Sequence, residues 1–123
     1  MPHRSFRIWD KKSKEFVWKG FSLSTQGKLL RFNSEVEDVE NFVLNFNTGF
    51  KDKYEKDIFE DDVLEHTIAK GGDIQTFQGI VEFEPKLAAF TVDGIPMFQL
   101  FSIRKLGNPY EFPLLYNSFL KKK

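Results

Sequence analysis

Short apolar runs separated by turn-forming residues are the feature that most constrains the fold of this chain. The runs are rich in aromatic and β-branched residues, which favour β-strands. Gly71 with Gly72, and Asp93 with Gly94, predict tight turns between consecutive runs. The pattern predicts strands over residues 6–9, 15–18, 21–24, 29–32, 42–46, 63–69, 74–83, 88–92 and 98–106.

A chain of 123 residues built from such strands is expected to form one mainly β domain over residues 1–123, as a small curved antiparallel sheet or a partly open barrel. Pro113 suits the first turn of a short C-terminal helix, whose negative end the lysines at 121–123 would complement. Ser34 and Glu37 have the spacing of a capping box, which predicts a short helix over residues 34–40. Gly79 indicates a bulge or bend within its strand.

Phenylalanine dominates the aromatic residues: the chain has 15 Phe against three Tyr and two Trp. Phenylalanine is found mostly in protein cores, whereas Tyr, Trp and Arg are typical of hydrated interfaces. We therefore expect most of the Phe rings to be buried and to form the core of the β domain. The alternative is an aromatic platform that stacks nucleobases.

Charge is segregated along the chain although Lys plus Arg equals Asp plus Glu, 18 each. Residues 1–31 have a net charge of +6, residues 32–66 of −8, and residues 67–123 of +2. The simpler interpretation is that these blocks mix on the surface of one fold. The other is that opposite patches attract one another between subunits of a homo-oligomer.

The cellular setting follows from what the sequence lacks. There is no cysteine, so neither a disulfide nor a thiolate metal site can form. The first residues lack the apolar run of a signal peptide, and no stretch has the roughly 20 apolar residues that span a bilayer. We expect a soluble protein of the reducing cytoplasm with no membrane partner.

The acidic stretch from Glu55 to Glu65, followed by His66, is the one candidate for acid–base or metal chemistry. An EF-hand loop starting at Asp52 fails on its ligand positions, and on a strand Asp62 and His66 would lie about 13 Å apart. We therefore expect a solvated loop with no metal, no cofactor and no catalytic residues. A metal-dependent hydrolase using Asp61, Asp62 and His66 is the disfavoured alternative.

Cations interleaved with aromatic rings near the N-terminus form the one candidate contact surface. Such a basic, aromatic hairpin could contact a protein partner, or could bind nucleic acid. Against nucleic acid, Lys outnumbers Arg across the chain, and Arg is the residue expected to read bases and phosphates. The candidate contact residues are Arg4, Arg7, Trp9, Lys11, Lys12, Lys14, Trp18 and Lys19.

Five segments together resemble the YopX family, small proteins of phages and bacterial prophages. Residues 6–14 resemble the opening of the family, residues 47–53 and 57–63 its central signature, residues 79–83 the strand between, and residues 106–115 its closing tail. The resemblance implies a mostly β, phage- or prophage-encoded accessory protein in a family without an established activity, and it brings no catalytic residues. We expect action through protein contacts and self-association.

Departures from the family pattern predict local differences. Asp61 occupies a position where the family usually has glycine, which predicts a residue with positive φ. Phe50 and Phe59 replace the usual Leu and Tyr, which suggests a drier environment at both points. Tyr54 and Glu55 replace a more usual Asn-Gly turn. Asp52 and Asp62 are expected to accept hydrogen bonds from backbone amides in the intervening loop.

Overall fold

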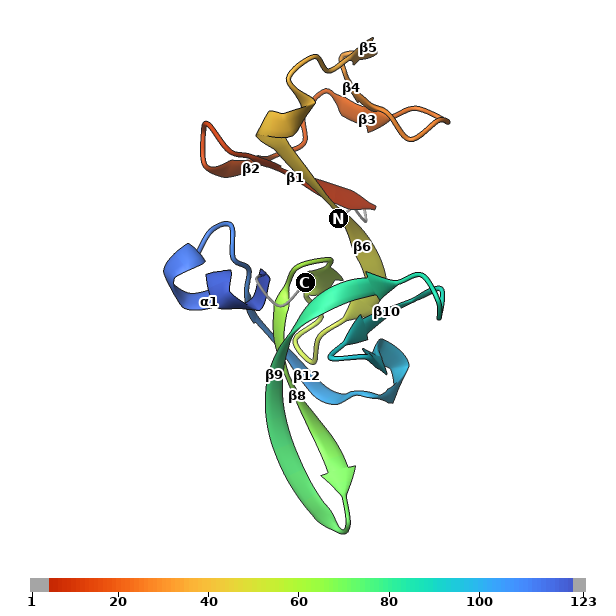
Figure 1. Ribbon diagram of the computed structural model, residues 1–123, viewed down its shortest axis with the longest axis vertical. Coiled ribbons are helices and arrows are strands. Elements are labelled where there is room, and N and C mark those ends of the chain that lie inside the picture. Colours follow the sequence, from red (N-terminus) through yellow and green to blue (C-terminus); the bar gives the residue numbers. More distant parts are fainter. Residues whose placement is uncertain (1–4, 121–123) are drawn as a thin grey trace.

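The fold is mainly β, as the sequence predicts, and takes the form of a curled, half-barrel antiparallel sheet with one short C-terminal helix (Figure 1). This computed structural model describes residues 5–120, apart from the side chain of Lys70. Every strand pairing in that range is antiparallel.

A four-stranded sheet in the order β2-β1-β6-β7 organises the N-terminal part of the molecule. The predicted hairpin is confirmed, with Trp9 opposite Phe16. The central strand β6 is much longer than predicted: its first half pairs with β1 and its second half with β7. The bounds are β1 Phe6–Asp10, β2 Glu15–Val17, β6 Phe42–Lys51 and β7 Asp57–Phe59.

A small sheet in the order β3-β4-β5 lies beyond this one, at the top of Figure 1. The helix predicted over residues 34–40 is wrong. Phe32 and Asn33 turn the chain with positive φ, so Ser34 pairs with Arg31 instead of starting a helix. A cross-strand partner here overrides the capping-box spacing. The elements are β3 Phe21–Leu23, β4 Leu29–Arg31, β5 Ser34–Glu35 and the 3-10 turn η1 Val39–Asn41.

A five-stranded sheet in the order β11-β10-β9-β8-β12 forms the C-terminal part. The turns predicted at 71–72 and 93–94 are confirmed, and β8 and β9 form the long hairpin at the bottom of Figure 1. Gly79 is not a bulge: it pairs in register with Leu64, and a β-carbon there would lie 2.5 Å from Val92 Cγ1. The elements are β8 Val63–Lys70, β9 Asp73–Glu84, β10 Ala89–Val92, β11 Ile95–Pro96, the 3-10 turn η2 Met97–Gln99 and β12 Phe101–Gly107.

A tight corner between β7 and β8 joins the two larger sheets. Asp61 N donates to Val81 O, and Val81 N donates to Asp62 O, both at 2.9 Å, so the corner is fixed to β9. Asp61 has a φ of +66°, which confirms the prediction from the position where the family usually has glycine.

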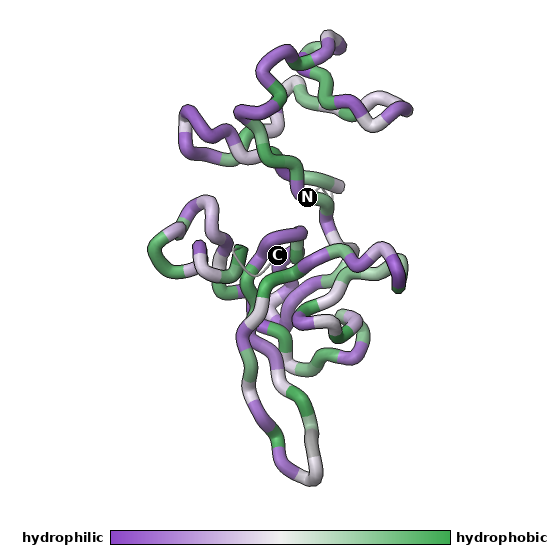
Figure 2. Tube along the Cα trace, viewed as in Figure 1, coloured by the Kyte–Doolittle hydropathy of each residue, from purple (hydrophilic) through white to green (hydrophobic). Residues whose placement is uncertain are grey.

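The core is aliphatic, so the prediction of a phenylalanine core is wrong. One cluster of Ile58, Leu64, Val81, Val92, Met97 and Leu100 fills the C-terminal part. Phe59 is the one buried phenylalanine in residues 5–120, at 8% exposed, and eight of the 15 are exposed. Hydrophobic and hydrophilic residues alternate along the coloured part of the trace (Figure 2), as in strands that have one face packed and one face outward.

The predicted C-terminal helix is confirmed as α1, Pro113–Leu120. Its inner face rests on β12 through Tyr116, whose ring would meet a β-carbon on Gly107 at 2.8 Å. Its outer face carries Leu114, which is fully exposed, and Leu115, which is 66% exposed. The lysines predicted to complement the helix lie outside the described residues.

Candidate functional site

The candidate contact residues that the structure describes do not form one surface. Arg4 lies outside the described residues. Arg7 and Trp9 are buried, at 8% and 7% exposed, so their place among the contact residues has to be corrected. The remaining residues are exposed but lie at opposite ends of β2: Lys11, Lys12 and Lys14 in the β1–β2 turn, and Trp18 and Lys19 in the β2–β3 turn.

Arg7 is buried because it is the centre of a polar network. Its Nη1 lies 2.7 Å from Asp62 Oδ1, and its Nε donates to Asn45 Oδ1 at 3.1 Å. Its Nη2 donates to the carbonyl of Glu60 at 3.1 Å. The guanidinium also lies over the ring of Phe16, at 4.7 Å from its centroid. Alternation along β1 turns this side chain to the face opposite Ile8, toward the β7–β8 corner.

Asp62 is fully buried and joins the N-terminal strand to the last one. Its Oδ2 lies 3.2 Å from Lys105 Nζ on β12, and it also accepts a hydrogen bond from Phe59 N at 2.7 Å. A buried carboxylate is tolerated only with such partners, because an uncompensated charge in the interior is very costly. The network therefore ties together β1, the β7–β8 corner and β12.

Asp61 extends the network to the segment before α1. Its Oδ2 accepts hydrogen bonds from Tyr110 OH and, at 3.1 Å, from Asn45 Nδ2. Burial, and then the hydrogen bond and charge of Asp61, raise the pKa of Tyr110 far above its ordinary value. The phenol therefore remains a hydrogen-bond donor across the physiological pH range.

The solvated loop predicted for the acidic stretch is wrong at Asp61 and Asp62, which are 6% and 0% exposed. The signal that sequence reasoning missed is Arg7, an arginine between two apolar residues of a predicted strand. Such a cation needs a carboxylate partner once the strand is buried, and the acidic stretch was available to supply it.

His66 is not part of this network. It is 1% exposed, its ring stacks on Phe77 with centroids 6.0 Å apart, and neither ring nitrogen has a hydrogen-bond partner within residues 5–120. Burial lowers its pKa, against an opposing effect of Asp93. Residues 5–120 contain no group of three or more His, Asp or Glu side chains placed to hold a metal ion. The trio Asp61, Asp62 and His66 is therefore not brought together as a metal-binding set.

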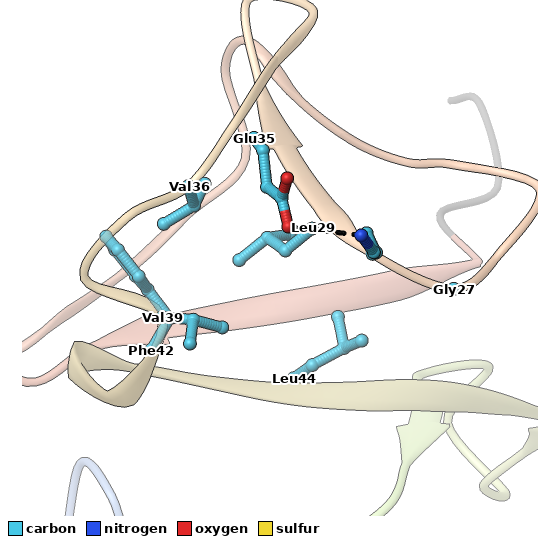
Figure 3. Close-up of a pocket in the computed structure, with 8 residues that line it drawn as sticks. Gly27, Leu29, Glu35, Val36, Val39, Phe42 and Leu44 are labelled. Carbon is cyan, nitrogen blue, oxygen red and sulfur yellow. Dashed lines mark ion pairs between the residues drawn. The ribbon is translucent and has the colours of Figure 1, made fainter.

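Two hollows on the N-terminal part could receive a partner. The first, of about 310 Å³, lies between the small sheet and β6, and we call it the apolar hollow (Figure 3). Its rim carries the ion pair between Lys28 and Glu35, at 3.5 Å. Its lining residues are Gly27, Lys28, Leu29, Glu35, Val36, Val39, Phe42 and Leu44.

The second hollow, of about 480 Å³, lies between β2 and the β3–β4 hairpin, and we call it the aromatic groove. It contains two of the predicted contact residues, Trp18 and Lys19. Its lining residues are Phe16, Val17, Trp18, Lys19, Phe21, Arg31 and Phe32. The sequence predicted only Trp18 and Lys19 of the seven as contact residues; Arg31 and Phe32 in particular are brought alongside by the β2–β3 and β3–β4 turns.

A third hollow, of about 640 Å³, lies between the β1–β2 turn and the start of α1, where Lys11 and Lys14 approach Tyr110 and Glu111. The described part of the chain has no helix with the length and apolar content to cross a membrane.

In comparison with known families, the family model described as YopX protein matches residues 5–116. The chain belongs to the YopX family. No curated protein matches it.

The segments that carry the YopX resemblance meet at the buried network. Arg7 comes from the opening segment, Asp61 and Asp62 from the central signature, and Tyr110 from the closing tail. Asp52, in the other central segment, accepts a hydrogen bond from Lys105 N at 3.0 Å. The segments of this chain that resemble the YopX family thus supply the buried contacts that hold its strands together.

Asp52 and Asp62 accept backbone hydrogen bonds, as expected. Asp52 also accepts from Tyr54 N and Lys56 N, both at 2.9 Å, and these donors, with Lys105 N, outweigh burial and lower its pKa. The expectation of a drier environment is confirmed for Phe59 and wrong for Phe50, which is 36% exposed. Glu55 takes a φ of +65° at the position of the more usual glycine.

Proposed function

We propose that this YopX-family protein is a phage- or prophage-encoded accessory protein that acts without catalysis, through contacts with protein and above all with a second copy of itself. Its site of action is the cytoplasm of a bacterial host. The observation that carries the proposal is the exposure of large apolar side chains. Two apolar surfaces are uncovered in the described residues: the apolar hollow, and the outer face of α1, where the neighbouring Leu114 and Leu115 are fully and 66% exposed; contiguous exposed apolar surface is typical of protein interaction sites.

Some charges of the basic and acidic blocks pair with each other within one chain, so fewer charged side chains remain for contacts between copies. Arg7 with Asp62, and Lys28 with Glu35, pair the basic block with the acidic block in one molecule. Glu37 and Asp38 stay exposed beside the apolar hollow, between its lining residues Val36 and Val39. The hollow is therefore apolar inside and acidic at one edge.

The outer face of α1 is the complementary surface on the same chain. Leu114 and Leu115 present apolar groups there, and three lysines follow the helix in the sequence. An apolar face followed by positive charge matches an apolar hollow edged by negative charge. We therefore propose that α1 of one copy occupies the apolar hollow of the other, and that a two-fold symmetric pair makes this contact twice.

Multi-angle light scattering over a range of protein concentrations tests the proposal. The wild-type protein is expected to form dimers that weaken, but persist, as salt is raised, because salt screens the charges and not the apolar contact. Val39→Lys in the hollow and Leu114→Lys on α1 should each shift the protein toward monomer.

Leu87→Lys is the matched control, since Leu87 is 54% exposed in the β9–β10 turn, outside both surfaces. This variant should dimerise like the wild type. A strict monomer at both low and high salt would overturn self-association. Equal loss of dimer in all three variants would overturn the assignment of the two surfaces.

A further inference from the structure

We infer that the aromatic groove binds single-stranded nucleic acid, with bases stacked on its rings and phosphates at Lys19 and Arg31. This activity is independent of the contact between copies, since the groove and the apolar hollow share no lining residue. The aromatic groove is also a different surface from the face of the β1–β2 hairpin, where Arg7 and Trp9 are buried.

The rings are placed to receive bases. Trp18 and Phe32 are 58% and 70% exposed at the groove, while Phe16 and Phe21 are half-buried within it. Base–aromatic stacking needs an accessible ring and an accessible base face. In a duplex the faces of each base are covered by the base pairs stacked above and below it, so the groove suits an unpaired strand.

Phe32 is held at the groove by a strained turn. Its φ is +49° and that of Asn33 is +67°, a conformation in which a bulky aromatic residue is a genuine outlier. A β-carbon on Gly20 would lie 2.6 Å from the Phe32 ring, so the ring rests directly on this glycine. Phe32 N also donates to Gly20 O at 2.7 Å. Strain that fixes an exposed ring in place points to a use for that ring.

The charge of the groove is positive. No carboxylate lines it, and neither Lys19 nor Arg31 forms an ion pair within residues 5–120. The Arg31 guanidinium lies over Phe21 and Phe42, at 4.7 and 5.1 Å from the ring centroids, which orients it without neutralising it. Two cations with no ion-pair partner in residues 5–120, beside the exposed rings of Trp18 and Phe32, match the alternation of phosphate and base along a single strand.

Fluorescence anisotropy with a labelled single-stranded oligonucleotide of about 12 nucleotides, a length in the range that such sites cover, measures the binding. At low salt we expect binding that weakens as salt is raised, and weaker binding of the matching duplex. Trp18→Ala should reduce affinity about tenfold or more, the usual loss for one stacked base. Lys19→Glu should reduce both the affinity and the salt dependence.

Lys12→Glu is the matched control, because it makes the same charge change on an exposed lysine at the other end of β2. It should retain most of the affinity, and circular dichroism should be the same for all variants. Because Lys19 forms no ion pair or side-chain hydrogen bond within residues 5–120, its replacement leaves no described partner exposed, and that variant keeps the test valid if Trp18→Ala misfolds. Trp9→Phe leaves Trp18 as the single tryptophan, whose fluorescence the oligonucleotide should quench.

Three results would overturn the inference. The first is no binding at low salt. The second is a loss of affinity in Lys12→Glu equal to that in Lys19→Glu, which would indicate diffuse charge attraction. The third is that an acidic peptide rich in Asp and Glu competes as well as the oligonucleotide, which would make the groove a protein site.

Discussion

The N-terminal region, β1 to β5, and the C-terminal region, β7 to β12, are held together in different ways. The C-terminal region has a single aliphatic cluster under a five-stranded sheet. In the N-terminal region the small sheet buries one residue, Leu29, and β1 is anchored by Arg7 through charges and rings.

This difference indicates a division of roles. Apolar burial stabilises a sheet without directional demands, whereas the Arg7 network requires particular partners at particular distances. The apolar hollow and the aromatic groove both lie on the less buried region. Binding surfaces are commonly carried by the parts of a protein that have the lowest local stability.

Removing the shared carboxylate is the strongest test of this contrast. Asp62→Ala leaves Arg7 and Lys105 without their common partner, so the free energy of unfolding should fall by about 3–5 kcal/mol. Urea denaturation followed by circular dichroism measures this loss. In this variant, the backbone amides of β1 should exchange hydrogen faster than in the wild type, while those of β9 change much less. Equal acceleration in both strands would contradict separate anchoring of the two regions.

Paired leucine truncations compare the two interiors directly. Leu64→Ala in the aliphatic cluster should cost about 2–5 kcal/mol of unfolding free energy, because it leaves a cavity in a closed core. Leu29→Ala should cost less, since its side chain already borders the apolar hollow. In urea denaturation, the shift of each midpoint at an unchanged slope of free energy against urea gives the two losses of unfolding free energy. A larger loss for Leu29 would reverse the proposed order.

Acid should weaken the C-terminal region through His66. Burial lowers the pKa of His66 in the folded state, whereas the unfolded chain takes up the proton near pH 6.5. The unfolded state therefore binds more protons as pH falls below about 6.5, and stability decreases. His66→Leu should flatten this dependence between pH 7 and 5 in thermal melts. An unchanged slope in the variant would assign the acid effect to other groups.

An exposed ion pair should give the smallest effect. Lys28 and Glu35 have side chains 56% and 63% exposed, and such pairs contribute less than about 1 kcal/mol. Glu35→Ala measured in the same urea assay is the surface counterpart of Asp62→Ala. A cost similar to that of Asp62→Ala would remove the distinction between buried and exposed charges here.

The sequence was a good guide to the strands and their turns because both depend on local chemistry. The β1–β2 hairpin, the turns at 71–72 and 93–94, and the helix beginning at Pro113 all follow from neighbouring residues. Residues 34–40 failed because the preference of Ser34 and Glu35 was decided by a partner strand that local spacing does not reveal.

The role of phenylalanine could not be predicted because alternation identifies two faces of a strand without saying which is covered. Phe83 and Phe90 pair across β9 and β10 with ring centroids 5.3 Å apart, yet Phe83 is 46% exposed. Alternation places Phe83 on the same face of β9 as Val81, which is fully buried, so the position along the strand decides which residues of that face are covered. The aromatic groove was predicted only at Trp18 and Lys19, which are near each other in sequence, whereas Arg31 and Phe32 are brought there by a second hairpin.

The ten residues of β6 also have a consequence for the order in which the chain assembles. β1 pairs with β6, and Arg7 reaches Asp62 across 55 positions of sequence, whereas β8 and β9 are joined by a short turn. Contacts between distant residues form later than those between neighbours. During synthesis, β1 therefore keeps apolar residues uncovered until residues 42–62 have been made. In that period a chaperone or a second nascent chain can bind β1.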